Sequence, residues 1–192
     1  LLGSKKAKYS LPYAVRESFK YLDELRDAVD YFVTQNRNSA EILVENGISL
    51  ARCFTVNQYI GESKLTKYPK DPTAPGNLRP LRFGYVGRWS KEKGIVILRD
   101  AIDTLKECDL ELWIIAKGID SDTFQKLFFE LAEKRQVKLF NDLSGKALAE
   151  KLALLDVAVI PSVCQEVGPR TFWECVAQEV PAIVSDSVGH RA

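Results

Sequence analysis

The stretch "LRFGYVGRWSKEKGIVILRDAIDTLKECDLELWIIA", residues 81–116, opens and closes with a short apolar run. The runs at 81–87 and 110–116 are almost continuously apolar, as strands covered on both faces of a sheet are. Apolar residues at helical spacing lie between them: Ile97, Leu98, Ala101, Ile102 and Leu105. A strand, a helix and a second strand in this order predict a parallel βαβ unit.

The same alternation continues toward the end of the chain. Three further apolar runs are candidate strands: "VKLF" (137–140), "DVAVIPS" (156–162) and "PAIVSD" (181–186). The helical stripes between the strands consist of Phe124, Leu127, Phe128, Leu131, Leu148, Leu152 and Leu155. We therefore expect residues 81–192 to form an α/β domain whose Rossmann-like parallel sheet carries helices on both faces.

Residues 62–80 hold four prolines among polar neighbours, which is the composition of a linker, and we place a domain boundary there. Residues 1–61 are expected to form a helix, a strand, a second helix and a second strand. The first helix starts near Ser10, and the second runs from about Ser39 to Gly47. Two strands cannot make a stable sheet alone, so we expect this part to dock on something outside the sequence.

Composition excludes several classes of protein. The 27 basic and 26 acidic residues nearly balance, which argues against a nucleic-acid partner. No apolar run approaches the roughly 18 residues of a transmembrane helix. The four cysteines are widely spaced and form no C-x-x-C pair, so we expect reduced, mostly buried thiols and no zinc site. We expect a cytoplasmic protein, free or peripheral to the cytoplasmic membrane.

The turn within "FGYVGRWSKEKG", residues 83–94, is the first candidate site. We expect a strand to end at Gly87 and Arg88 and a helix to begin near Lys93 and Gly94. Ligands of open α/β sheets bind beyond the carboxyl ends of strands, where helix N-termini offer free N–H groups. Two cations at such a point suit a diphosphate. An ordinary turn with solvated cations is the alternative, and a dinucleotide fingerprint fits poorly because the glycines do not make G-x-G-x-x-G.

The stretch "PSVCQEVGPRTFWEC", residues 161–175, is the second candidate site. Glu166 follows the fourth strand, and Glu174 should lie one turn inside a helix that starts near Arg170. Carboxylates that face one cleft are suited to accept hydrogen bonds from the hydroxyls of a sugar or ribose. A pair of ordinary surface glutamates and an acid/base pair of the glycoside hydrolase type are the alternatives. The neighbouring diphosphate turn favours binding.

Three weaker signals remain. Asp120 and Asp122 form a D-x-D that could chelate a metal, but a helix cap is favoured there, so we expect no metal site. His190 follows the last strand, and an incidental position is favoured over ligand contact. Trp89 could stack on a base or sugar, although packing is favoured.

Taken in order, these motifs resemble the C-terminal, donor-binding half of the retaining nucleotide-sugar glycosyltransferases with the GT-B fold, glycosyltransferase family 4. That family shows "GR" at the end of a strand, "KG" opening a helix, and two glutamates separated by seven residues before a small apolar strand. The matching residues are Gly87, Arg88, Lys93, Gly94, Glu166 and Glu174. The resemblance runs from about Tyr31 to the end, and residues 31–60 resemble the last part of the family's N-terminal acceptor domain.

The resemblance implies a role for each residue. Arg88 and Lys93 would hold the donor diphosphate, and Glu166 would hold the hydroxyls of the transferred sugar. Glu174 would hold the ribose, and the backbone around Gly168 would lie beneath the sugar and pyrophosphate. Three residues depart from the family pattern, which blurs the sugar and base contacts: Pro169, Ala116 and Asn141.

The resemblance also implies an activity. The protein would move a hexose from a nucleoside diphosphate sugar to a sugar, lipid-linked or glycoconjugate acceptor, with retention of configuration and without a metal or other cofactor, in polysaccharide biosynthesis. The chain would be incomplete, because the acceptor domain and the last strand and helices would lie outside it. A non-catalytic nucleotide-sugar-binding module and a GT-B-like sugar-nucleotide epimerase are the alternatives.

Overall fold

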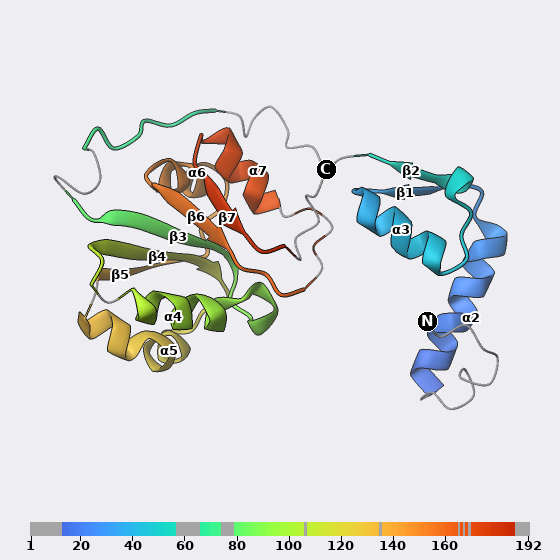
Figure 1. Cartoon of the computed structure of the whole chain (residues 1–192), viewed down its shortest axis with the longest axis horizontal. Helices are drawn as coiled ribbons and strands as arrows, with labels where there is room; N and C mark the ends of the chain where they lie inside the picture. Colours follow the sequence, from blue (N-terminus) through green and yellow to red (C-terminus); the bar gives the residue numbers. More distant parts are fainter. Residues whose placement is uncertain are drawn as a thin grey trace. The chain divides into compact units, whose positions relative to one another are not determined.

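The computed structural model describes residues 13–56, 66–73, 79–105, 107–134, 136–164, 166, 168 and 170–186. The chain divides into two compact units, which meet in the sequence between Asn57 and Gln58 (Figure 1). The placement of one unit relative to the other is not determined, so each is described by itself. None of the described helices is long and apolar enough to cross a membrane.

The N-terminal unit has the predicted order of elements: α2 (Tyr13–Ala28), β1 (Phe32–Thr34), α3 (Arg37–Glu45), a 3₁₀ turn (Leu50–Arg52) and β2 (Cys53–Thr55). The two strands pair in parallel. Helix α3 begins two residues before the predicted Ser39, because the Asn36 side chain accepts a hydrogen bond from the Ser39 backbone N–H at 2.7 Å and caps the helix. The expected cap at Ser10 lies outside the described residues.

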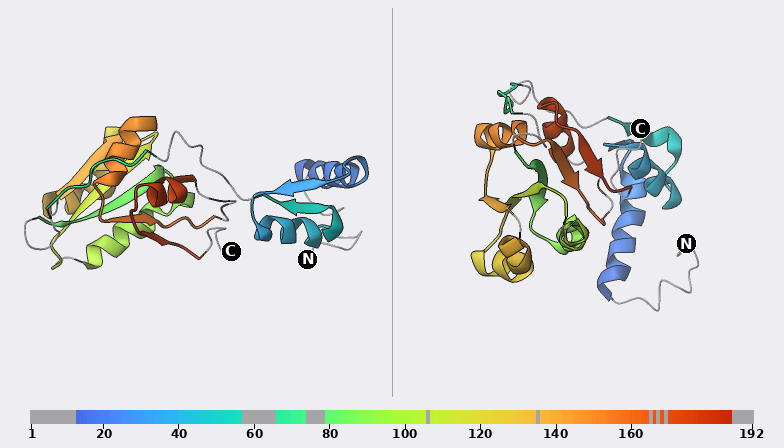
Figure 2. Two further views of the ribbon diagram at one scale, coloured as in Figure 1. Left: turned by 90° about the horizontal axis from the view of Figure 1, so that it is seen from above. Right: turned by 60° about the vertical axis from the view of Figure 1, so that its left-hand side comes forward.

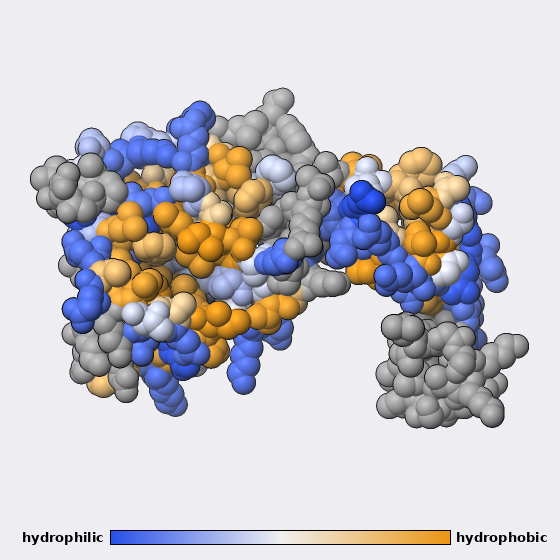
Figure 3. Space-filling view, in the orientation of Figure 1, coloured by the Kyte–Doolittle hydropathy of each residue, from blue (hydrophilic) through white to orange (hydrophobic). Residues whose placement is uncertain are grey.

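Large apolar side chains are exposed on the N-terminal unit, and Figure 3 shows orange residues among the blue ones on its visible face. Val33 and Phe54 face each other across the two strands and are both exposed. The rings of Tyr31 and Phe54 meet edge to face, with their centroids 5.5 Å apart. A covering partner for this sheet remains a prediction.

The second unit contains the predicted parallel sheet. Its strands are β3 (Leu81–Arg88), β4 (Leu110–Lys117), β5 (Gln136–Asn141), β6 (Val157–Ile160) and β7 (Ala182–Val184). They are all parallel, in the order β5-β4-β3-β6-β7. Strand β6 ends at Ile160, two residues before the predicted Ser162, because the nitrogen of the following Pro161 has no hydrogen to donate to a neighbouring strand.

Helices cover both faces of this sheet, which confirms the predicted fold class. Figure 2 shows α4 (Ile95–Thr104) and α5 (Ser121–Lys134) on one face, and α6 (Gly145–Ala153) and α7 (Arg170–Ala177) on the other. Side chains alternate between the two cores along β4: Leu112 and Ile114 pack with α4 and α5, whereas Trp113 and Ile115 pack toward α6 and α7.

The order of the strands fixes where a ligand site can form. The chain runs outward from β3 to β4 and β5, then crosses back and lays β6 on the other side of β3. The carboxyl ends of β3 and β6 therefore form a topological switch point, where the connections leave in opposite directions and open a crevice. The described parts of the loops that meet there are residues 89–94 and residues 161–164, 166 and 168.

Gly94 joins these two loops. It has a φ of 73°, and a Cβ added to it would lie 1.8 Å from the carbonyl oxygen of Pro161. Next to it, the backbone N–H of Val163 donates to the carbonyl of Glu92 at 2.9 Å. The expected start of a helix at Lys93 and Gly94 is confirmed, with a 3₁₀ turn (Lys91–Lys93) preceding α4.

A network of charges lies at the opposite, amino ends of the strands. The Arg79 guanidinium donates two hydrogen bonds to Asp156, at 2.6 and 2.8 Å, and both side chains are largely buried. Asp156 also accepts from the backbone N–H of Arg82, and the Arg82 side chain donates to Asp71 at 2.6 Å. These bonds fasten the segment before β3 to the starts of β3 and β6.

Part of the predicted linker packs on this unit. The Gln178 side chain accepts from the backbone N–H of Tyr68 at 3.1 Å and donates to the carbonyl of Thr66 at 2.9 Å. Gln178 is buried, and Lys67 forms an ion pair with Glu179. Residues 66–70 are therefore held against the turn that follows α7. The boundaries at 62 and 80 remain predictions.

We predict that Gly94→Ala destabilises the protein more than Gly118→Ala. Gly118 has nearly the same φ, 75°, but open space where its Cβ would be. The left-handed conformation costs a non-glycine residue roughly 1–2 kcal/mol at either position. Overpacking against Pro161 adds roughly 1–3 kcal/mol at position 94 alone. Urea unfolding of both variants measures the difference, and equal losses would show that the close approach is not a constraint.

We also predict that the stability contributed by Asp156 depends on pH. Burial raises the pKa of this carboxyl, but hydrogen bonds from Arg79 and from the Arg82 backbone outweigh burial and hold the pKa below the ordinary value of 3.8. The contribution is therefore complete above the ordinary pKa and is lost as the pH falls through the lowered folded-state pKa. The variant Asp156→Asn removes the carboxylate that accepts two hydrogen bonds from Arg79 and leaves Arg79 its ionic contact with Asp71, at 3.3 Å. This should cost about 3 kcal/mol at neutral pH.

Urea unfolding of the wild type and Asp156→Asn at about pH 7 and about pH 3 tests this. The difference in free energy of unfolding should shrink at the lower pH. A difference that is the same at both pH values would contradict the assigned ion pair.

Candidate functional site

Two adjoining cavities lie at the switch point. The first, which we name the loop cavity, measures about 200 Å³ and lies between the loops that follow β3 and β6. The second, the helix cavity, measures about 310 Å³ and lies among the ends of β3 and β4 and the N-terminal parts of α6 and α7. Residues common to both are Val86, Gly87, Arg88, Arg170 and Thr171. The two cavities are therefore adjacent, and we refer to them together as the groove.

The structure brings most of the predicted site residues to this groove. Gly87 and Arg88 line both cavities. The loop cavity also contains Lys93, Glu166 and Gly168, and the helix cavity contains Glu174. Gly94 lines neither cavity. The structure accounts for this glycine by its contact with Pro161, so its expected place at a phosphate remains a prediction.

Arg88 presents a free positive charge to the groove. Its side chain is exposed, and among the described residues no carboxylate lies within ion-pair distance of it. Its backbone is fixed, because the buried Tyr85 hydroxyl donates to the Arg88 carbonyl at 2.6 Å. Burial raises the pKa of Tyr85, so this hydroxyl stays protonated. A cation on a fixed strand end is suited to bind an anion.

Lys93 and Glu166 form an ion pair across the loop cavity. The Glu166 carboxylate also accepts a hydrogen bond from the Ser162 hydroxyl at 2.8 Å. Burial raises the pKa of Glu166, but the hydrogen bonds from Lys93 and Ser162 outweigh burial and hold the pKa below its usual range. The carboxylate is therefore ionised at neutral pH and acts as an acceptor only.

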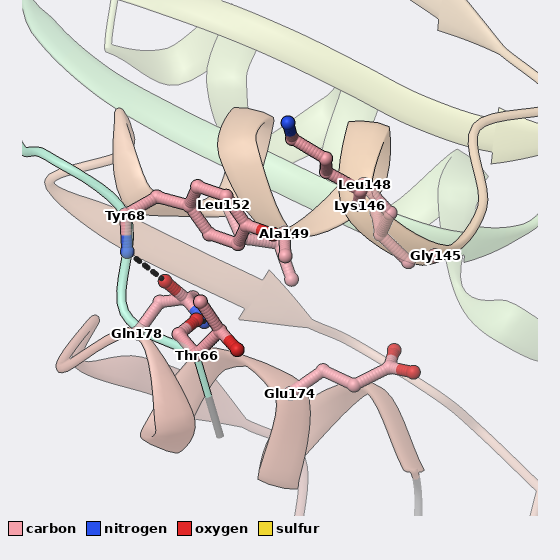
Figure 4. Close-up of a pocket in the computed structure, with 9 residues that line it drawn as sticks. All are labelled: Thr66, Tyr68, Gly145, Lys146, Leu148, Ala149, Leu152, Glu174 and Gln178. Carbon is pink, nitrogen blue, oxygen red and sulfur yellow. Dashed lines mark hydrogen bonds between the residues drawn. The ribbon is translucent and has the colours of Figure 1, made fainter. Parts of the chain in front are cut away.

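Glu174 borders the helix cavity from α7. Its carboxylate lies 3.4 Å from the Arg170 guanidinium, and its side chain is only 12% exposed. A third cavity, of about 210 Å³, lies on its other side between α6, α7 and the segment at Thr66 and Tyr68. Figure 4 shows the Glu174 side chain extending away from Gln178, which holds that segment. Glu174 therefore lies on the wall that separates two hollows.

The sequence analysis missed several residues of the groove. Arg170 and Thr171 begin α7 and line both cavities, at a helix N-terminus that favours anions. The only signal for them was the expected start of the helix near Arg170. Ser162 was seen only as the end of a strand, and Tyr85 as an apolar strand residue. The hydrogen bonds of Ser162 and Tyr85 depend on how segments pack in the folded protein. The pattern of neighbouring residues in the sequence does not predict that packing.

The structure tests two of the three weaker predictions made from the sequence, those for Trp89 and Asp120. Trp89 packs against the rings of Phe124 and Phe128, so the favoured packing role is confirmed. Asp120 accepts a hydrogen bond from the backbone N–H of Thr123 at 2.7 Å and caps α5, also as favoured. His190 and Pro169 lie outside the described residues. In the described part of the chain, no group of three His, Cys, Asp or Glu side chains is arranged to hold a metal ion.

The expectation of mostly buried cysteines is wrong. All four thiols are free, but only Cys175 is buried; Cys108 is exposed, and Cys53 and Cys164 are half-buried. Cys108 lies in the turn between α4 and β4. Wide spacing in the sequence gives no information about burial in turns.

Comparison with known proteins identifies the family and supports the fold. Residues 71–192 match the family described as glycosyl transferases group 1. No protein with a curated description matches the chain. Among solved structures, a glycosyltransferase from Rickettsia africae superposes with a TM-score of 0.72 at 16% identity, over 94% of this chain and 50% of that one.

Two further structures show the same fold. HepE of Anabaena, solved with UDP and glucose, has a TM-score of 0.70 at 16% identity, over 90% of this chain and 49% of that one. The lipopolysaccharide outer core galactosyltransferase WaaB has a TM-score of 0.63 at 23% identity, over 84% of this chain and 44% of that one. The chain thus spans about half the length of these structures. The sheet and its helices match the C-terminal, Rossmann-like half of GT-B glycosyltransferases. Because the family match covers more than half of its residues, the chain belongs to the group 1 glycosyl transferases.

Proposed function

We propose that this chain supplies the donor site of a retaining glycosyltransferase of family 4, which transfers a hexose from a nucleoside diphosphate sugar. One observation carries the proposal. The two adjacent cavities at the switch point of the sheet hold the exposed cation Arg88, the Lys93–Glu166 ion pair and the carboxylate of Glu174. A nucleoside diphosphate sugar carries the complementary groups, a diphosphate with hydroxyls on either side.

The diphosphate is assigned to Arg88 and Lys93. A guanidinium can bind two phosphate oxygens at once, and the Lys93 ammonium has three protons to donate. Lys93 can therefore keep its contact with Glu166 while it binds a phosphate oxygen. The N-terminus of α7 at Arg170 adds a favourable dipole near the same groove.

The hydroxyls of the donor are assigned to the two carboxylates. Glu166 lines the loop cavity beside Lys93, which suits the hydroxyls of the transferred sugar. Glu174 lines the helix cavity on the other side of Arg88, which suits the ribose. The backbone of Gly168 lines the loop cavity as well, in agreement with its proposed place beneath the sugar and pyrophosphate.

The proposed chemistry follows from where charge develops. As the bond from the sugar to the diphosphate breaks, negative charge grows on the leaving diphosphate. Fixed cations stabilise that charge more in the transition state than in the ground state, which lowers the barrier. We therefore propose that Arg88 and Lys93 assist the leaving group, that Glu166 orients the sugar, and that no metal is required.

Retention, the acceptor and the pathway are proposed for the whole protein. We propose a sugar, lipid-linked or glycoconjugate acceptor bound by an N-terminal domain, and a role in polysaccharide biosynthesis at the cytoplasmic side of the membrane or in the cytoplasm. NMR of the product made by the full-length protein tests retention, because the anomeric coupling constant reports the configuration. An inverted product would refute it.

We predict that nucleoside diphosphates bind this chain through Arg88 and Glu174. UDP is the first to test, since the HepE structure holds it, followed by GDP and ADP. Charge-assisted hydrogen bonds contribute about 1.5–3 kcal/mol each, so Arg88→Ala and Glu174→Ala should each weaken binding by about 10- to 100-fold. Isothermal titration calorimetry measures the affinity.

Arg99→Ala is the matched control. Arg99 lies on α4, pairs with Asp100 and lines neither cavity, so its loss should leave the affinity unchanged. If no nucleotide binds the wild type, or if Arg88→Ala binds as tightly as the wild type, the assigned donor site is wrong.

We also predict that nucleotide binding needs no divalent metal. Arg88 and Lys93 would neutralise the diphosphate, so the UDP affinity in EDTA should equal the affinity in excess Mg²⁺ within about twofold. Transfer by the full-length protein should be insensitive to EDTA as well. A large loss of either in EDTA would show that a metal takes part.

A further inference from the structure

The Glu166 carboxylate is held through one of its two oxygens. Three side chains in the described part of the chain donate to it, and all three reach Oε1: Lys93 through Nζ, Ser162 through Oγ at 2.8 Å, and Cys164 through Sγ at 3.8 Å. Within the described residues no donor reaches Oε2. The side chain is 14% exposed and lines the loop cavity, so Oε2 is the oxygen available to a ligand.

Ser162 is the most firmly placed of the three donors. It is only 1% exposed, and it lies two residues after the end of β6. Its carbonyl accepts a hydrogen bond from the Ser185 hydroxyl, which follows β7. The backbone of Ser162 is therefore held between the ends of two neighbouring strands, and its buried hydroxyl donates to Glu166 from this fixed position. By contrast, Lys93 has a long flexible stem, and a thiol such as that of Cys164 is a weak donor.

The three donors also differ in what a ligand does to them. Under the proposed function Lys93 binds the donor diphosphate, and its hydrogen bond to Glu166 is then shared with a phosphate oxygen. Ser162 is buried and is not drawn away in this manner. In the ligand-bound state it is the donor that keeps Oε1 in place.

We propose that Ser162 is a positioning residue. It fixes the rotamer of Glu166 so that Oε2 faces the loop cavity and accepts hydrogen bonds from the hydroxyls of the transferred sugar. This inference rests on the proposed function and assigns no contact between Ser162 and the ligand. Because Glu166 would act on the sugar and not on the nucleotide, loss of Ser162 should affect the sugar alone.

Ser162→Ala tests the proposal by comparing a nucleotide with its sugar conjugate. The probes are UDP, UDP-glucose, UDP-galactose, GDP and GDP-mannose, titrated by calorimetry into the chain. For the conjugate that binds the wild type best, Ser162→Ala should weaken binding by about tenfold, the loss of roughly one hydrogen bond to a charged group. The affinity for the parent nucleotide should stay unchanged.

Two further variants sharpen the test. Ser162→Cys keeps a side chain of similar size with a weaker donor, so the loss should be selective for the sugar and smaller than in Ser162→Ala. If thermal melting shows that Ser162→Ala does not fold, Ser162→Cys replaces it as the test variant. Ser49→Ala is the matched control, since Ser49 is exposed in the N-terminal unit and its side chain caps no helix.

The outcomes separate this inference from the proposed function. If the wild type binds no nucleotide, the proposed donor site fails, and the role of Ser162 fails with it. If the wild type binds and the Ser162 variants match it, the positioning role alone is overturned. Equal losses for the nucleotide and its sugar conjugate would show that Ser162 supports the fold of the site, and would overturn the role as well.

Discussion

The backbone of Gly94 lies so close to the carbonyl of Pro161 that no side chain fits between them, and the rest of the site depends on this contact. The contact joins the loop that follows β3 to the loop that follows β6. Lys93 directly precedes Gly94, and Glu166 lies five residues after Pro161. Their ion pair is therefore a consequence of the joined backbones, together with the hydrogen bond from Val163 to Glu92. A cation and an anion from loops more than 60 residues apart in sequence are held as one unit.

This contact occurs where it does because of the strand order. A parallel sheet that grew in one direction only would place each loop beside the next loop in sequence. Here the chain returns across the sheet after β5, so the loop after β3 meets the loop after β6. The groove can then collect Arg88 from the first strand of the sheet and Glu174 from its last helix. The match to the family model shows that the chain belongs to the group 1 glycosyl transferases. The strand order explains how residues far apart in the sequence come together at one groove.

Local pattern was sufficient to predict the five strands, the helices and the class of fold, because continuous apolar runs and helical stripes are properties of neighbouring residues. The cluster of Arg88, Lys93, Glu166 and Glu174 followed from the general position of sites beyond the carboxyl ends of strands and from the resemblance. The contact between Gly94 and Pro161 did not follow, because nothing in "KEKG" encodes which distant carbonyl it meets. For the same reason the sequence does not predict that residues 66–70 pack beside Gln178, and the apolar run predicts a strand that continues to Ser162.

Charged side chains lie at both ends of the sheet, but they are paired to different extents. This difference in pairing is a better guide to a ligand site than the presence of charges. At the amino ends the charges are mutually satisfied: Arg79 with Asp156, Arg82 with Asp71, and the buried Glu111 with Lys138. At the carboxyl ends the described residues leave Arg88 without an ionic partner and Oε2 of Glu166 without a donor. A satisfied network stabilises the fold and has little capacity for a ligand. Under the proposed function, a ligand would complete the network at the carboxyl ends by bringing the opposite groups. Because the joined loops and a buried serine already hold these side chains, binding would need little reorganisation of the protein.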